Sequence, residues 1–298
     1  LQAWPAAAAR LRGWLENVEA DGEDPAFAID ASAEPAGHRG AALLVPVVLR
    51  MDEVDPGHPI FGDAQAGLLL RIHVTAHASL GAVGRARLSI EGECGPDARA
   101  AFEAAVDAVL RERVRGAPGS KRTWFRLRWE PTAVRLDGRS AALPCWLAAR
   151  AAREELVPSI LLRVPAWGLA ATGDLDGAAA AIVPVDATSL AEKVRACFRG
   201  RAAAVIVPAA QRPGALAEAA RLQATLPERQ LLVLGGRTPA EIWQDARLWK
   251  VRQRRPRELL AALAQRLASS RAVLAGLLSL LLAAGGIAGW EAWLSRPD

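Results

Sequence analysis

Lysine is scarce in this chain. Only Lys121, Lys193 and Lys250 occur among the 37 basic residues of the 298-residue sequence. Arginine cannot lose its proton near neutral pH, whereas a desolvated lysine can. A cationic side chain that acts as a general base is therefore restricted to these three positions.

Cysteine and histidine are also few. The three cysteines, Cys94, Cys145 and Cys197, are odd in number and widely spaced, which suits a reducing compartment and predicts no metal site. All four histidines lie before position 80, so a Ser-His-Asp triad is a poor fit. Gly116–Lys121 lacks the spacing of a phosphate-binding loop, and no such loop occurs elsewhere in the sequence. We expect neither a cofactor nor a metal.

The chain divides into four segments by composition. Residues 1–40 read as an amphipathic helix followed by a linker, and the start at Leu1 rather than Met suggests a fragment or a processed product. Residues 41–248 mix strand and helix patterns, which predicts an α/β (α+β) domain. Residues 249–271 form a basic juxtamembrane segment, and residues 272–294 are predicted to be a transmembrane helix. Within the α/β domain, Ala42–Arg50 is predicted as an edge strand because Pro46 interrupts it.

Charge and hydropathy are uneven near the C-terminus. Residues 250–271 hold seven basic residues and one acid, and without them the chain is close to neutral, so no basic domain for nucleic acid is predicted. Ala272 to Trp290 is uncharged over 19 residues, enough to cross a hydrocarbon core. The basic flank and the Trp residues predict a single-pass anchor in the cell membrane, with the larger domain on the cytoplasmic side. The alternative is a helix buried in a partner assembly.

Ser140 lies where a loop is predicted to enter a helix. Trp124–Glu130 alternates apolar and basic residues and reads as a half-buried strand, and an Ala-rich helical pattern runs from about Ala141 to Leu156. Position alone favours a helix cap. A serine in this place can also act as a nucleophile, because the free N–H groups of the helix could hold an oxyanion.

Lys193 lies in a predicted helix over Leu190–Arg199. A capping-box pattern at Ser189–Glu192 places Lys193 in the first turn or just beyond it, where the helix dipole should lower the pKa of the ammonium. Val194 and Phe198 make its helix face apolar. A surface lysine that reaches out to water is the alternative, but this placement favours a general base.

Four segments together resemble the proteolytic domain of Lon-type peptidases, which use a Ser–Lys dyad. The resemblance covers roughly residues 66–248. Arg139 and Ala142 depart from the family's usual Pro and second Gly, and Val185–Ser189 stands where the family has Gly-Gly. The matching segments are Asp-Gly-Arg-Ser-Ala-Ala at 137–142, Thr-Gly-Asp at 172–174, Leu-Ala-Glu-Lys at 190–193 and Ala-Ala-Val-Ile-Val-Pro at 203–208.

The resemblance implies a Lon-like mixed sheet with helices and a serine endopeptidase without its own ATPase. Lys193 would take the proton from Ser140, with Thr172 orienting the lysine and Asp137 nearby. The partners implied are a protein substrate and membrane lipid, with a regulatory subunit or further copies of the chain gating activity in a regulatory or defence role. The alternative function is a catalytically inactive Lon-like fold that serves as a membrane-tethered assembly module.

Overall fold

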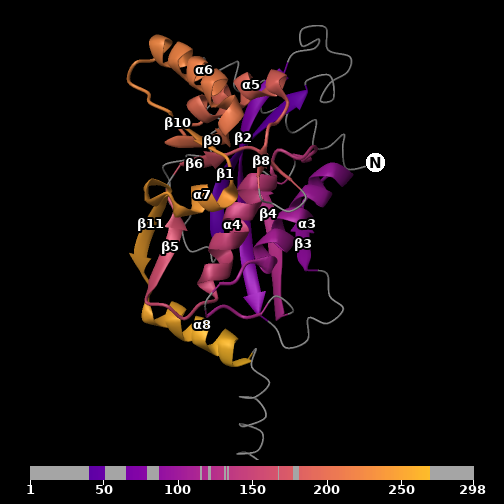
Figure 1. The fold of residues 1–298 in the computed structure, drawn as a ribbon, viewed down its shortest axis with the longest axis vertical. Coiled ribbons are helices and arrows are strands. Elements are labelled where there is room, and N and C mark those ends of the chain that lie inside the picture. Colours follow the sequence, from indigo (N-terminus) through magenta and orange to yellow (C-terminus); the bar gives the residue numbers. More distant parts are fainter. Residues whose placement is uncertain are drawn as a thin grey trace, which may run out of the picture.

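The chain forms a mixed α/β fold around a seven-stranded sheet, seen in the computed structural model of Figure 1. This confirms the predicted fold class at the level of a mixed sheet with helices. The structure describes residues 40–50, 65–78, 87–114, 116–119, 122–130, 132, 134–166, 168–176 and 181–268.

The sheet has the strand order β10-β9-β6-β1-β2-β4-β3. Strands β10, β9, β6 and β1 are parallel, β2 is antiparallel to both β1 and β4, and β3 is parallel to β4. The strands are β1 (Ala41–Arg50), β2 (Gln65–Ala78), β3 (Leu88–Glu91), β4 (Thr123–Glu130), β6 (Leu169–Ala171), β9 (Ala204–Pro208) and β10 (Leu232–Gly236).

Two short antiparallel ladders accompany the main sheet. One pairs β5 (Leu161–Pro165) with β11 (Trp249–Gln253), and the other pairs β7 (Asp174–Leu175) with β8 (Ile182–Val183). Because β11 pairs with β5, the first part of the basic segment predicted at 249–271 belongs to the folded domain.

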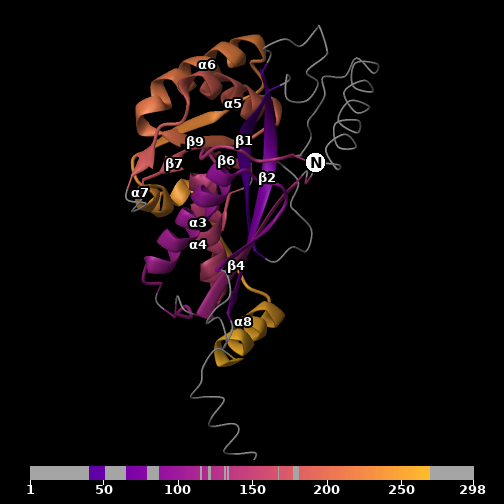
Figure 2. The same ribbon diagram turned by 90° about the vertical axis from the view of Figure 1, so that its right-hand side faces the viewer.

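The helices cover both faces of the sheet. Helices α3 (Pro96–Arg111) and α4 (Ala142–Glu155) pack on one face, and α5 (Ala187–Arg199) and α6 (Arg212–Thr225) lie on the other (Figure 2). Strand β1 shows the division residue by residue, because Leu43 and Val45 join the core under α3 and α4 while Leu44 joins the core under α5. The remaining helical elements are η2 (Ala209–Gln211), α7 (Pro239–Gln244), η3 (Ala246–Leu248) and α8 (Pro256–Ala268).

Alternating patterns predicted the strands well but did not identify the edges of the sheet. In β4 the side chains of Phe125, Leu127 and Trp129 are fully buried, as the alternation predicts. The prediction of β1 as an edge strand is wrong, since β1 lies between β2 and β6. Pro46 is tolerated because β6 pairs with β1 only at Leu44, so the side of β1 next to β6 has no further strand ladder.

The described residues include two buried cysteines and a nearly buried histidine, but not the predicted membrane span. Cys145 and Cys197 are buried, and all three cysteines are free thiols. His73 is only 6% exposed and lies 3.5 Å from a carboxylate oxygen of Glu130. No helix within the described ranges is both long and apolar enough to cross a bilayer, and the predicted span at 272–294 lies outside those ranges, as do residues 1–39.

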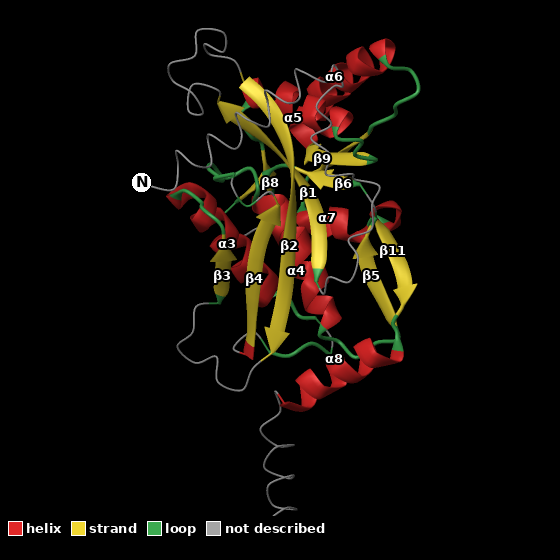
Figure 3. Cartoon of the chain, turned by 180° about the vertical axis from the view of Figure 1, so that it is seen from behind, coloured by secondary structure: helices red, strands yellow, loops and turns green. Residues whose placement is uncertain are grey.

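Helix α8 lies at the far end of the molecule from α6, beneath the ends of the long strands (Figure 3). It is the last described element before the predicted span.

A close approach at Gly67 sets the distance between α5 and β2. A Cβ atom at this position would lie 2.2 Å from the carbonyl oxygen of Glu192. We expect Gly67→Ala to push α5 off the sheet and to lower the free energy of unfolding by about 1–3 kcal/mol, as measured by urea denaturation. Gly119→Ala is the matched control, because nothing lies within 4 Å of the added atom. Equal loss in both variants would show that the contact with α5 is not the cause.

Candidate active site

Ser140 lies in the turn that leads into α4. Gly138 adopts a positive φ of 73°, which a glycine tolerates, and the helix then begins at Ala142. The residue in the N-cap position is Ala141, and no side chain caps the helix. Ser140 is therefore not the N-cap, and its hydroxyl makes no hydrogen bond to another residue of the described ranges. The half-buried hydroxyl is left accessible to a bound group.

Backbone hydrogen bonds join this turn to the segment after β6. The N–H of Gly173 donates to the carbonyl oxygen of Ser140 at 2.9 Å, and the N–H of Leu143 donates to the carbonyl oxygen of Gly173 at 3.1 Å. A Cβ at Gly173 would lie 2.9 Å from Ile182 Cγ2, so only glycine fits at this crossing without a shift of its neighbours. The nucleophile segment and the Thr-Gly-Asp segment, which the resemblance placed in one site, are thus in direct contact.

Thr172 directly precedes this crossing and is fully buried. Its N–H continues the ladder by donating to the carbonyl oxygen of Ile206 at 2.9 Å. Alternation along the strand places its side chain on the same face as Ala170, which packs in the core under α5. The buried Oγ1 atom has no hydrogen-bond partner among the described residues. Thr172 therefore offers an unused polar group on the α5 side of the sheet.

Helix α5 begins earlier than the capping-box pattern predicted. Asp186 is the N-cap, and its carboxylate accepts a hydrogen bond from the N–H of Thr188 at 3.1 Å. The helix therefore starts at Ala187 rather than near Leu190, and Lys193 lies in the second turn. The helix dipole fades beyond the first turn, so it is not what shifts the pKa of Lys193.

Burial accounts for the state of Lys193. The residue is only 5% exposed, so the alternative of a surface lysine is wrong. Two of its neighbours along the helix, Val194 and Cys197, belong to the core between α5 and the sheet. Loss of hydration penalises the ammonium and lowers the pKa of Lys193 from 10.5 to about 8, against opposing electrostatic effects of Asp186 and Cys197. At pH 7 about a tenth of the protein then carries a neutral amine here.

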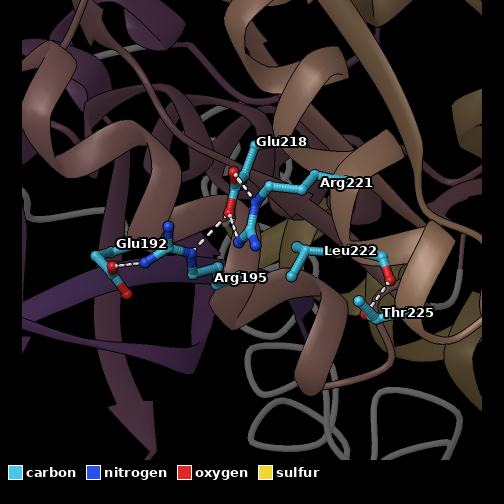
Figure 4. Close-up of polar contacts among 6 residues, drawn as sticks. All are labelled: Glu192, Arg195, Glu218, Arg221, Leu222 and Thr225. Atoms are coloured by element: carbon cyan, nitrogen blue, oxygen red, sulfur yellow. Dashed lines mark hydrogen bonds and ion pairs between the residues drawn. The ribbon is translucent and has the colours of Figure 1, made fainter.

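A charged network fixes α5 to α6 next to Lys193 (Figure 4). Arg195 donates to Glu192 on its own helix and, at 2.7 Å, to Glu218 on α6. Arg221 also donates to Glu218, through two hydrogen bonds of 2.9 and 2.7 Å. These arginines lower the pKa of Glu218 to about 2, so its carboxylate stays charged across the physiological range. The helix that carries Lys193 is thereby held on both sides, by the sheet and by α6.

Two acidic residues near Ser140 have different roles. Asp137, predicted to lie in the site, is exposed and accepts a hydrogen bond from Arg135 at 3.0 Å. Asp174 accepts one from Arg139 at 2.6 Å, which links the residue before Ser140 to the start of β7. Sequence reasoning noted Arg139 only as a departure from the family pattern.

The structure shows no direct polar contact within the proposed dyad among the described residues. No hydrogen bond joins Lys193 to Ser140 or Thr172 among the described residues. Of the N–H groups at the start of α4, that of Ala142 donates to Arg139 at 3.0 Å and that of Leu143 donates to Gly173. An oxyanion would have to use the earlier amides, those of Ser140 and Ala141. Catalytic hydrogen bonds are often long in unliganded sites and tighten when substrate binds.

Within the described ranges, no group of three His, Cys, Asp or Glu side chains is arranged to hold a metal ion.

The chain matches no known protein family, and no curated protein is detectably similar to it in sequence. The resemblance to Lon-type peptidases therefore depends on the sequence motifs alone.

Burial of Lys193 should reduce the stability of the fold. Below pH 8 the folded protein holds an ammonium in an apolar site, and this penalty fades between pH 8 and 10.5 as the unfolded chain also loses its proton. We expect Lys193→Met to raise the free energy of unfolding at pH 7 by on the order of 2 kcal/mol, as measured by urea denaturation. The gain should shrink toward pH 10. A variant no more stable than the wild type at pH 7 would contradict the burial.

Proposed function

We propose that the protein is a membrane-anchored serine endopeptidase of the Lon-like type with a Ser140–Lys193 dyad. The observation that carries the proposal is the buried Lys193, whose pKa is lowered to about 8 on a helix that shares a hydrophobic core with Ala170, two residues before Thr172. Gly173 in turn is hydrogen-bonded to the turn of Ser140. An amine that is uncharged part of the time and a serine in the turn before a helix suit proton transfer and nucleophilic attack.

In the proposed reaction Lys193 takes the proton from the Ser140 hydroxyl as its oxygen attacks a peptide carbonyl. The resulting oxyanion is held by the N–H groups of Ser140 and Ala141. Lys193 then returns the proton to the amine that leaves, and water hydrolyses the acyl-enzyme. Thr172 Oγ1 accepts a hydrogen bond from the lysine amine and orients it. The ion pair of Arg139 with Asp174 holds the turn of Ser140 in register with β7.

The second candidate is an inactive fold that acts as a membrane-tethered assembly module. Two observations favour it: no hydrogen bond joins the lysine to the serine among the described residues, and two of the amides at the start of α4 are already engaged. Retention of a destabilising buried lysine opposes it, because a module without catalysis gains nothing from that residue.

The dyad is tested by cleavage of proteins in a mixture. Full-length protein in a neutral detergent is added to a proteome, and newly formed protein N-termini are identified by labelling and mass spectrometry. Wild type should generate N-termini that Ser140→Ala and Lys193→Arg do not, because arginine stays protonated. Ser159→Ala and Lys250→Arg are the matched controls and should retain activity.

The rate on one substrate so identified should depend on pH through the same lysine. Neutral amine is the active form, so kcat/KM should rise about tenfold per pH unit below 8 and level off above it. Activity that survives in Lys193→Arg would contradict the general-base role. A wild type that generates no N-termini beyond those of Ser140→Ala would favour the assembly module.

The predicted anchor is tested separately. With residues 272–294 in the bilayer, the protein should stay with membranes through carbonate and high-salt washes, because neither extracts an apolar span. Protease added outside sealed cells should leave residues 1–248 intact. Release by carbonate would mean that the segment is a helix of an assembly. Digestion from outside would place the larger domain on the opposite side.

A further inference from the structure

A second site is suggested by a cavity of about 760 Å³ at the end of the sheet next to α8. It opens where β1 separates from β6, which pair at a single residue, Leu44 with Ala170. Its walls come from the first part of β1, the second half of β2, the end of α4, the β5–β11 ladder and α8. The cavity shares none of the residues proposed for catalysis, and its size is in the range that binds small molecules.

The lining of this cavity is strongly basic. Five arginines face two glutamates, and the arginines are Arg71, Arg252, Arg254, Arg255 and Arg257. One of the glutamates, Glu258, is already paired with Arg252 at 2.7 Å. The exposed guanidinium groups of Arg255 and Arg257 have no carboxylate within ion-pair distance in the described part of the chain. The cavity therefore carries positive charge that its own acids do not balance.

Arg254 supplies a buried donor. The residue is only 7% exposed, and its Nη2 atom donates to the carbonyl oxygens of Glu154 and Glu155 at 3.1 and 2.9 Å. These bonds fix the guanidinium at the end of α4. Its Nε atom is buried and has no acceptor among the described residues. A buried donor without an acceptor is costly, and an anion in the cavity would provide the acceptor.

The other acid of the cavity, Glu155, does little to offset the arginines at neutral pH. Its carboxylate accepts a hydrogen bond from the N–H of Gly40 at 3.1 Å. Burial raises its pKa to about 7, although Arg254 and Arg252 act in the opposite direction. Near pH 7 this side chain is then protonated about half of the time.

We propose that this cavity binds a phosphate-bearing anion through Arg254, Arg255 and Arg257. Planar guanidinium groups suit phosphate, because each offers two parallel N–H donors. The site is independent of the proposed peptidase activity, and its test uses binding rather than cleavage.

The phosphate could belong to a lipid headgroup or to a soluble molecule. Helix α8 contributes Ala261 and Ala262 to the cavity and exposes Leu260 (66%) and Leu263 (38%) to solvent. The chain continues from α8 toward the segment predicted to span the membrane. These features favour an anionic phospholipid, and the experiment separates the two sources.

The experiment titrates full-length protein, in a neutral detergent without phosphate, with three probes and follows binding by calorimetry. The probes are dioctanoylphosphatidylglycerol, glycerol phosphate and dioctanoylglycerol. Wild type should bind a phosphate probe saturably, and Arg255→Gln/Arg257→Gln should bind it at least about tenfold more weakly. The control is Arg99→Gln/Arg111→Gln, which removes the same charge from exposed positions on α3 and should bind as wild type does. Thermal unfolding of each variant checks that the fold is intact.

Each outcome is decisive. Binding of the phospholipid alone assigns the site to a lipid headgroup, and comparable binding of glycerol phosphate assigns it to a soluble phosphate. The proposal is overturned if neither phosphate probe binds wild type, if both double variants lose affinity equally, or if dioctanoylglycerol binds as tightly as the phospholipid. If wild type binds a phosphate probe but generates no new N-termini in the cleavage experiment, the result counts against the proposed peptidase and leaves the anion site standing.

Discussion

Burial of the central sheet on both faces is the constraint on which the rest of the structure depends. Strand β1 sends neighbouring side chains into two separate cores, one under α3 and α4 and the other under α5. Ser140 lies in the turn before α4, a helix of the first core, and Lys193 belongs to α5, a helix of the second. Side chains on opposite faces of a sheet can approach each other only beyond the end of a strand. The short β6, which stops at Ala171, provides that end, and Thr172 and Gly173 occupy it.

The same arrangement explains how an ammonium group can be kept in an apolar place. An isolated lysine would relieve its burial by a small movement of its helix toward water. Helix α5 is not free to move in this way, because Gly67 lets it lie directly on β2 and Arg195 ties it to Glu218 of α6. The burial that this packing enforces lowers the pKa of Lys193, and the nearby carboxylate of Asp186 acts in the opposite direction.

The sequence predicted the elements of the fold better than their neighbours in space. Alternation located β4 because this strand buries one full face of side chains. It could not reveal that β1 is central, since strand order depends on contacts between distant residues. The start of α5 was misplaced because Asp186 and Ser189 are both good caps, and Glu192 pairs with Arg195 instead of completing a capping box.

For the candidate site as well, some residues could be predicted from the sequence and others could not. Ser140 and Lys193 could be selected from residue type and local pattern, and Thr172 from the resemblance. The ion pair of Arg139 with Asp174 could not, because it joins residues 35 positions apart. The exposure of Asp137 could not be predicted either, since it depends on Arg135 and on how the turn is oriented.

The two-stranded ladder of β5 and β11 has a mechanical consequence. It links α8, and whatever follows α8, to the body of the protein, yet it is not hydrogen-bonded into the seven-stranded sheet. A pull or a tilt applied at the C-terminal end would load this ladder first. Part of that load would pass to α4, because the carbonyl oxygens of Glu154 and Glu155 accept hydrogen bonds from Arg254. The turn of Ser140 lies at the opposite end of this helix, so the strain would enter far from the site.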